Sequence, residues 1–98
     1  MIKINSEELL IIQEILRQYV PNAEVRVFGS RHKGNIKDTS DLDLVIINDK
    51  KIDLFQLAML KEAFEESTLP FRVDVLDWYR ITEDFRKHIE ESYTVLKF

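Results

Sequence analysis

The stretch FGSRHKGNIKDTSDLDLVII, residues 28–47, joins two short apolar segments through a polar loop. A glycine–serine pair, Gly29 and Ser30, ends the first segment, and Asp41 and Asp43 open the second. Both segments alternate in hydrophobicity, which is typical of half-buried β-strands. Because successive side chains of a strand point to opposite faces, Asp41 and Asp43 are expected to share one face. The stretch therefore predicts two strands, with a pair of carboxylates at the beginning of the second.

The remainder of the chain predicts helices and one more strand around these two. Cap residues precede three segments with helical periodicity: Asn5 or Ser6, Asp53, and Thr82. The predicted strands span residues 24–28, 41–47 and 72–76. Leu96 is assigned to the inner face of the last helix because it continues that helix's apolar spacing. The order of helices and strands places the chain in the α/β (α+β) class, as a small sheet of three or more strands packed on helices.

Length and composition restrict the class of protein. With 98 residues, 45% of them hydrophobic, the chain is expected to form a single domain over residues 1–98. It contains no cysteine, which excludes disulfides, thiolate catalysis and cysteine-based zinc sites. Apolar runs are too short for a membrane span and the N-terminus has no apolar leader, so we expect a cytoplasmic protein. A net charge of −4 argues against an extended nucleic-acid-binding surface.

Asp41, Asp43 and Asp74 are the candidate metal ligands and catalytic residues. Mg²⁺ prefers oxygen ligands, usually one or two carboxylates, with water and substrate phosphates in the other positions. Asp74 interrupts an apolar run on the third predicted strand, where a carboxylate is costly to bury unless it is paired or metal-bound. Two-metal phosphoryl chemistry needs such an additional carboxylate near the first pair. The three aspartates therefore predict a magnesium site, with two ions expected.

Gly29, Ser30 and Arg31 are the candidate nucleotide-binding residues. Where a strand ends and a helical turn begins, backbone N–H groups converge and bind anions. A glycine lets a phosphate approach the backbone, a serine adds a hydroxyl donor, and an arginine pairs with phosphate oxygens through two hydrogen bonds. The spacing from Gly29 to Gly34 imitates half of a P-loop, but the lysine and hydroxyl residue of that loop do not follow. We therefore expect a triphosphate site of another kind.

Structural explanations compete with these functional ones. A salt bridge to Arg72 or Arg26 would also explain the position of Asp74. Asp77 is a second candidate for the third carboxylate, but it lies past the predicted strand and is expected to cap or turn the chain. His88 is expected at the edge of the core. The aromatic pair after the third strand, compatible with packing and with partner contact alike, is Trp78 and Tyr79.

A Gly-Ser pair, a ten-residue gap, an Asp-x-Asp and a third aspartate on a later strand resemble the signature of the polymerase-beta-like nucleotidyltransferases. Residues 29–31, 40–44 and 73–78 are most similar to the minimal nucleotidyltransferase (MNT) family, and the resemblance covers nearly the whole chain. It implies a small mixed sheet packed on helices. It also implies the roles of the site residues. Gly29 and Ser30 would bind the triphosphate, Asp41 and Asp43 would bind both metal ions, and Asp74 would help to activate the acceptor hydroxyl.

The function implied by this resemblance is transfer of a nucleoside monophosphate, AMP from ATP, to a hydroxyl acceptor. MNT proteins are often paired as antitoxins with helical HEPN toxins, and some transfer AMP to a tyrosine of that partner, so a HEPN-type partner is implied. The alternative is a catalytically weak nucleotide-binding module that masks a helical partner; a homo- or hetero-oligomer fits either. An RNA-tailing enzyme is disfavoured by the acidic charge balance. Nothing in the sequence distinguishes adenine from another base.

Overall fold

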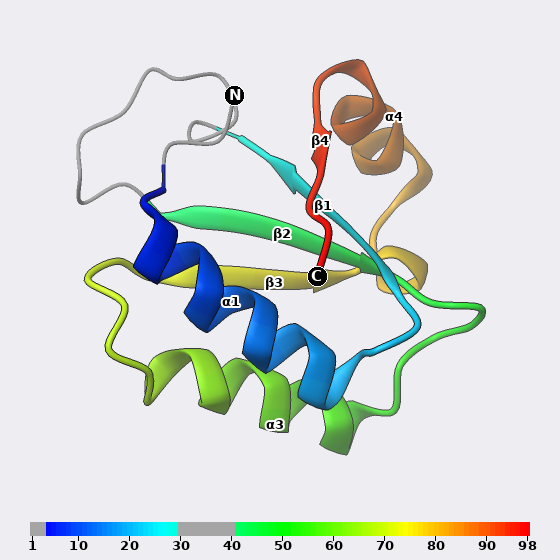
Figure 1. Ribbon diagram of the computed structural model, residues 1–98. Helices are drawn as coiled ribbons and strands as arrows, with labels where there is room; N and C mark the ends of the chain where they lie inside the picture. The colour runs from blue at the N-terminus through cyan, green and yellow to red at the C-terminus, as the bar shows by residue number, and fades with distance from the viewer. Residues whose placement is uncertain (1–3, 30–40) are drawn as a thin grey trace.

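In the part of the chain that the structure describes, four strands form one mixed sheet with helices on both faces (Figure 1). The computed structural model describes residues 4–29 and 41–98. The elements are α1 (Ser6–Tyr19), β1 (Glu24–Phe28), β2 (Leu42–Ile47), α3 (Leu54–Glu65), β3 (Val73–Asp77), the 3-10 helix η1 (Trp78–Arg80), α4 (Glu83–Glu91) and β4 (Thr94–Val95). Within the described ranges, no helix has the length and apolar character needed to cross a membrane.

The strand order is β3-β2-β1-β4, with β1 antiparallel to both β2 and β4, and β2 parallel to β3. This is the mixed sheet on helices that the resemblance implied. The short strand β4 was not predicted, because two residues are too few to show alternation. The assignment of Leu96 to the last helix is wrong: α4 ends at Glu91, and the Leu96 N–H donates to the Val25 carbonyl in the sheet.

The larger core lies between the sheet and the helices α1 and α3. Asn5 caps α1 in a capping box with Glu8. Asp53 caps α3, and its side chain accepts hydrogen bonds from the N–H groups of Phe55 and Gln56. One face of each long strand supplies the apolar partners for these helices. The buried residues at the centre of this core include Ile12, Leu16, Val25, Val27, Leu42, Leu44, Ile46, Leu57, Leu60 and Phe64. This face of the sheet is therefore scaffold.

The opposite face of the sheet is covered only in part. Helix α4, capped by Thr82, packs Ile89 against Phe28 and Val45 in a second, smaller core. The Phe85 ring contacts Phe28 edge-on, with the ring centroids 5.9 Å apart. The rest of this face is polar and partly open to solvent. A chemical site built from β1, β2 and β3 has room only on this side.

Strand β3 lies one residue further along the chain than the sequence predicted, and it includes Asp77. The Asp77 side chain is buried; it accepts N–H groups from Ile52 and Tyr79 and forms a 3.1 Å ion pair with Arg80. The expected capping role is thus confirmed, whereas the expected position past the strand is wrong. Trp78 packs against the smaller core, so the packing explanation holds for that residue.

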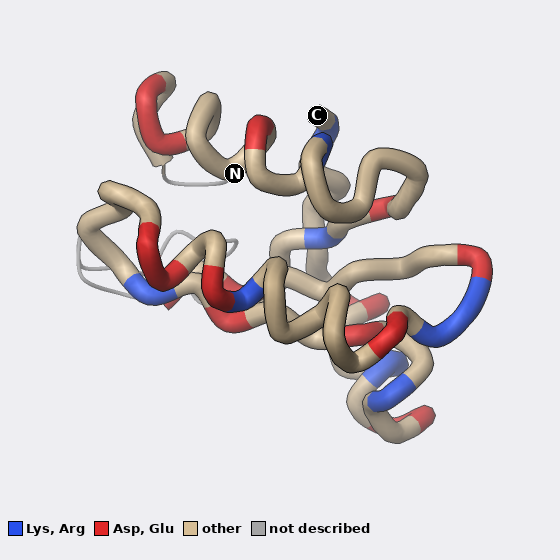
Figure 2. The backbone as a smooth tube through the Cα atoms, turned by 90° about the horizontal axis from the view of Figure 1, so that it is seen from below, with Lys and Arg blue, Asp and Glu red and all other residues tan. Residues whose placement is uncertain are grey.

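Charged residues are spread widely over the described backbone. Figure 2 shows Lys and Arg interspersed with Asp and Glu along its turns and helices, without a continuous basic stripe in the described part. A protein that grips long nucleic acid through many phosphates usually gathers its basic residues on one face. The charge distribution therefore favours a small, local binding site over an extended nucleic-acid-binding surface.

Candidate active site

Three neighbouring strands place Gly29, Asp43 and Asp74 side by side. In the sheet register Asp43 pairs with Phe28 of β1, directly before Gly29, and with Asp74 of β3. Paired residues on adjacent strands point to the same face, and the strands lie about 4.8 Å apart. The face that these residues share is the one that α4 leaves partly uncovered. The structure therefore brings together one predicted phosphate-binding residue and two predicted metal ligands.

Gly29 has a backbone conformation and a contact that only glycine allows. Its φ angle is 78°, in the left-handed region that side chains rarely adopt. A Cβ atom added to Gly29 would lie 2.2 Å from Oδ2 of Asp43, far inside van der Waals contact. The Asp43 carboxylate therefore lies against the backbone at the end of β1. An anion bound at that strand end would lie close to any cation held by Asp43.

Asp43 is the electrostatic centre of the described site. Partial burial, followed by the negative charges of Asp74 and Asp41, raises the pKa of Asp43 from 3.8 to about 6. Burial disfavours the charged carboxylate, and two neighbouring carboxylates repel it. A divalent cation placed among the three would remove both penalties. The environment of Asp43 is thus one that favours a bound cation.

Asp74 takes part in an ion pair as well as facing Asp43. Its Oδ1 lies 3.1 Å from Nη2 of Arg72, so the salt bridge considered for Asp74 does exist. The Arg72 side chain is 74% exposed and that of Asp74 is 39% exposed, so this pair contributes little to stability. The ion pair therefore leaves the Asp74 carboxylate available for other contacts.

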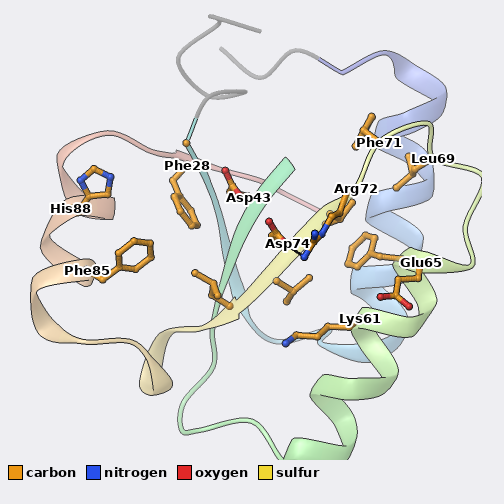
Figure 3. Close-up of a pocket in the computed structure, with 15 residues that line it drawn as sticks. Phe28, Asp43, Lys61, Glu65, Leu69, Phe71, Arg72, Asp74, Phe85 and His88 are labelled. Carbon is orange, nitrogen blue, oxygen red and sulfur yellow. Dashed lines mark ion pairs between the residues drawn. The ribbon is translucent and has the colours of Figure 1, made fainter. Parts of the chain in front are cut away.

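A cleft of about 960 Å³ opens over this site (Figure 3). It reaches from Phe85 and His88 of α4, past Asp43 and Asp74, to Lys61 and Glu65 of α3 on the other side of β3. The remaining lining residues are Phe28, Gly29, Phe64, Leu69, Phe71, Arg72, Val73, Val75 and Leu76. The carboxylates thus lie inside a cleft of a size suited to a nucleotide and part of a second substrate.

The donor set fits a magnesium ion that is shared with a substrate. In the described part of the chain, no three His, Cys, Asp or Glu side chains are already arranged to ligate one metal ion. Mg²⁺ usually takes one or two carboxylates from the protein and completes its shell with water and phosphate oxygens. Asp43 and its neighbouring carboxylates match that pattern, so the residues present fit the ion.

The other predicted site residues differ in their position relative to Asp43. Asp41 is exposed, directly before β2, and is close enough to raise the pKa of Asp43. Ser30 and Arg31 lie outside the described residues. Asp77 is the wrong residue for the third carboxylate, because it points to the opposite face of β3 from Asp74 and is held by Arg80.

Sequence reasoning missed the aromatic and basic residues that line the two ends of the cleft. His88, expected at the core edge, is exposed and tilts against Phe85 with the ring centroids 5.8 Å apart. Lys61 was not singled out at all. The three-residue spacing from Phe85 to His88 placed both on one helix face. The sequence did not show, however, that this face would turn towards Asp43, because that depends on how α4 packs on the sheet.

Comparisons with known proteins agree with this geometry. A family model described as "Polymerase beta, Nucleotidyltransferase" matches residues 11–97. A Haemophilus influenzae protein named "Probable protein adenylyltransferase MntA" is 52% identical over 94 residues, which is 96% of this chain and 82% of the relative. The match includes both the strands that carry the aspartates and the helices that support them.

Solved structures share the fold at lower identity. A toxin–antitoxin crystal structure with AMP-PNP is 20% identical and covers 96% of this chain and 73% of its own, with a TM-score of 0.76. A complex of tri-AMPylated Shewanella oneidensis HEPN toxin with MNT antitoxin is 17% identical over 93% of this chain and 70% of its own, with a TM-score of 0.70. At these identities the likeness establishes a shared architecture.

Proposed function

The chain belongs to the polymerase beta nucleotidyltransferase family, and from that membership we propose that it transfers AMP from ATP to a hydroxyl group of a HEPN-type partner protein. The observation that carries the proposal is the register of Gly29, Asp43 and Asp74 on one open sheet face. The relative's name supports protein adenylylation, and the solved complexes with HEPN toxin support the kind of partner. Adenine as the base and a protein hydroxyl as the acceptor follow from this assignment.

The phosphates of ATP bind at the end of β1. Gly29 has no side chain that would cover the backbone at this strand end, and the space that its Cβ atom would take is filled by the Asp43 carboxylate. Ser30 and Arg31, which follow Gly29 in the sequence, donate hydrogen bonds from their hydroxyl and guanidinium groups to the phosphate oxygens. The leaving pyrophosphate is therefore held on the β1 side of Asp43.

Asp41, Asp43 and Asp74 would hold the magnesium, with two ions in the complete site. Bound there, the ions would supply neutralisation of the charge that develops during the transfer. Among the chain's own residues, Asp43 lies centrally between the phosphate-binding end of β1 and Asp74 on β3. Burial and the charges of Asp74 and Asp41 raise the pKa of Asp43, and a cation held beside these carboxylates would favour the anionic form.

Asp74 positions and deprotonates the acceptor. The acceptor oxygen attacks the α-phosphorus of ATP, and the bond from that phosphorus to the oxygen bridging to the β-phosphate breaks. Pyrophosphate leaves with the electron pair, and the hydroxyl proton passes to the Asp74 carboxylate and from there to water. Most of the rate enhancement then comes from orientation and from charge stabilisation, as is usual in phosphoryl transfer.

Two labelling experiments with Mg²⁺ and the HEPN-type partner test this function. ATP labelled at the α-phosphate should label the partner, whereas ATP labelled at the γ-phosphate should not. That pattern identifies nucleotidyl transfer and excludes a kinase. Label arriving from the γ-phosphate, or no label from either position in the presence of a bound partner, would overturn the assignment.

A second activity, masking of the partner by direct binding, is favoured by one surface observation. The first half of α3 exposes large apolar side chains: Leu54 is 64% exposed, Phe55 is 72% exposed and Met59 is 39% exposed. Exposed apolar clusters of this kind usually mark protein-binding surfaces. This surface lies on α3, away from the face that carries Asp43, so binding and transfer are compatible activities.

A further inference from the structure

Strand β3 is at the edge of the sheet, and among the described residues nothing pairs with its outer backbone. The sheet order places only β2 beside it. The Leu42 N–H donates to the Arg72 carbonyl at 2.9 Å, so the backbone of residue 72 faces β2. In a parallel ladder the peptide groups alternate in direction. The N–H and C=O groups of Val73 and Val75 therefore face outward, and no backbone bond to them from the described residues is present.

The direction of the transfer points to this edge. An in-line displacement places the attacking oxygen and the leaving oxygen on opposite sides of the α-phosphorus. In the proposed function the leaving pyrophosphate is held at the β1 end, beside Gly29, and Asp43 lies between β1 and β3. The acceptor hydroxyl must then arrive from the β3 side, past Asp74.

The cleft continues around the β3 edge instead of ending at Asp74. Figure 3 shows it bounded by Arg72, directly before β3, and by Lys61 and Glu65 on α3. These side chains present both signs of charge, and Arg72 is largely exposed. A segment of polypeptide can lie in this part of the cleft with its backbone against β3. Its own side chains would then meet the charged groups of Arg72, Lys61 and Glu65.

We propose that the outer edge of β3 binds an extended segment of the acceptor protein as an added strand. Its backbone pairs with Val73 and Val75, and a side chain opposite Asp74 points into the site. This inference rests on the proposed adenylyl transfer and specifies how its acceptor docks. An added strand lies about 4.8 Å beyond β3 and so about 10 Å from β2. The acceptor side chain opposite Asp74 has to span that distance to reach Asp43 on β2.

A proline substitution tests the docking edge without touching a carboxylate. Val73→Pro removes one outward N–H at the first residue of an edge strand, where proline is tolerated. The matched control is Val95→Pro on the opposite edge of the sheet. The Val95 N–H also faces outward, because the neighbouring Leu96 N–H is the one that bonds to β1. Thermal unfolding establishes that both variants are folded.

Steady-state AMP transfer to the HEPN-type partner gives the readout. For Val73→Pro the KM for the partner should rise about tenfold, the effect of one lost hydrogen bond, while the KM for ATP stays unchanged. Val95→Pro should match the wild type in both constants. A partner KM for folded Val73→Pro equal to that of the wild type would overturn the docking proposal. Absence of transfer by the wild type would instead contradict the proposed function.

Hydrogen exchange on the wild-type protein tests the same edge independently of any variant's folding. The amides of Val73 and Val75 should exchange at least about tenfold more slowly when the HEPN-type partner is bound, because pairing protects them. The Val95 amide on the other edge serves as the internal reference. Unchanged exchange at Val73 and Val75, with a partner that is adenylylated in the same preparation, would contradict the added strand.

Discussion

Gly29 and Asp43 are coupled more tightly than their separation in the sequence suggests. The carboxylate of Asp43 occupies the space where a side chain at Gly29 would begin, and the backbone of Gly29 has a positive φ angle. The glycine therefore serves two purposes, because it permits the turn at the end of β1 and it leaves the carboxylate in place. The sequence showed the turn but not the contact.

Replacing Gly29 by alanine tests this coupling. In the wild type the new Cβ must displace Asp43, so we expect AMP transfer to fall at least about a hundredfold and stability to fall by about 1–2 kcal/mol. In an Asp43→Ala background the collision with the carboxylate is gone, and only the backbone strain of about 1 kcal/mol should remain. Chemical denaturation of the four proteins measures the difference. Equal costs in the two backgrounds would show that the contact is unimportant.

The pKa of Asp43 gives a second test at the level of a single residue. Burial contributes most to raising this pKa, and the charge of Asp74 contributes more than that of Asp41. In the metal-free protein, Asp74→Asn should lower the pKa of Asp43 from about 6 towards 3.8, without reaching it because burial persists. Titration of the Asp43 carboxyl signal by NMR measures this. A pKa that does not move would mean that the two carboxylates do not interact.

The same pKa sets the sign of a stability change. The folded protein binds the Asp43 proton more tightly than the unfolded chain, so the Asp43 contribution to stability falls as pH rises from 3.8 through about 6. Above that pH, a divalent cation bound at Asp43 should offset the loss. We therefore expect Mg²⁺ to raise the melting temperature more at pH 7 than at pH 5.

At the level of elements, the strands that carry the site were predictable and their surroundings were not. Cap residues located the starts of α1 and α3, and alternation located the three long strands to within a residue, whereas α3 ends at Glu65, before the expected stop at Leu69 and Pro70. The strand β4 was missed, and Leu96 was misassigned, because both depend on pairing with β1 across a long stretch of sequence. Local sequence patterns predict whether a segment is a helix or a strand, but they do not predict which element it packs against or pairs with.

The exposed half of α3 yields a prediction at this scale. Phe55→Glu places a charge on the exposed apolar surface of α3, so we expect binding to a HEPN-type partner to weaken about a hundredfold. Binding of ATP should be unchanged, because Phe55 does not line the cleft over Asp43. Calorimetric titration with the partner and with ATP measures both. Glu66→Gln, an exposed change just beyond the helix, is the control. Undiminished partner binding by Phe55→Glu would remove α3 from the interface.

On the scale of the whole molecule, the two faces of the sheet have separate tasks. One face is closed by α1 and α3, and it fixes the strand register that brings Asp43 beside Asp74. The other face is only partly covered by α4, and the cleft begins there and continues around the β3 edge to α3. Side-chain parity along each strand was enough to predict that the aspartates share a face. That Phe85 and His88 of α4 line the cleft could not be predicted, because it depends on how the helix packs on the sheet.

The central claim is that this face transfers AMP and that Asp43 is essential to the transfer. The most direct measurement is the intact mass of the HEPN-type partner after incubation with ATP, Mg²⁺ and the protein. The wild type and the control Asp49→Asn, changed at an exposed turn residue, should each add the mass of AMP. Asp43→Asn should leave the partner unmodified. AMP addition by Asp43→Asn at the wild-type rate would contradict the account.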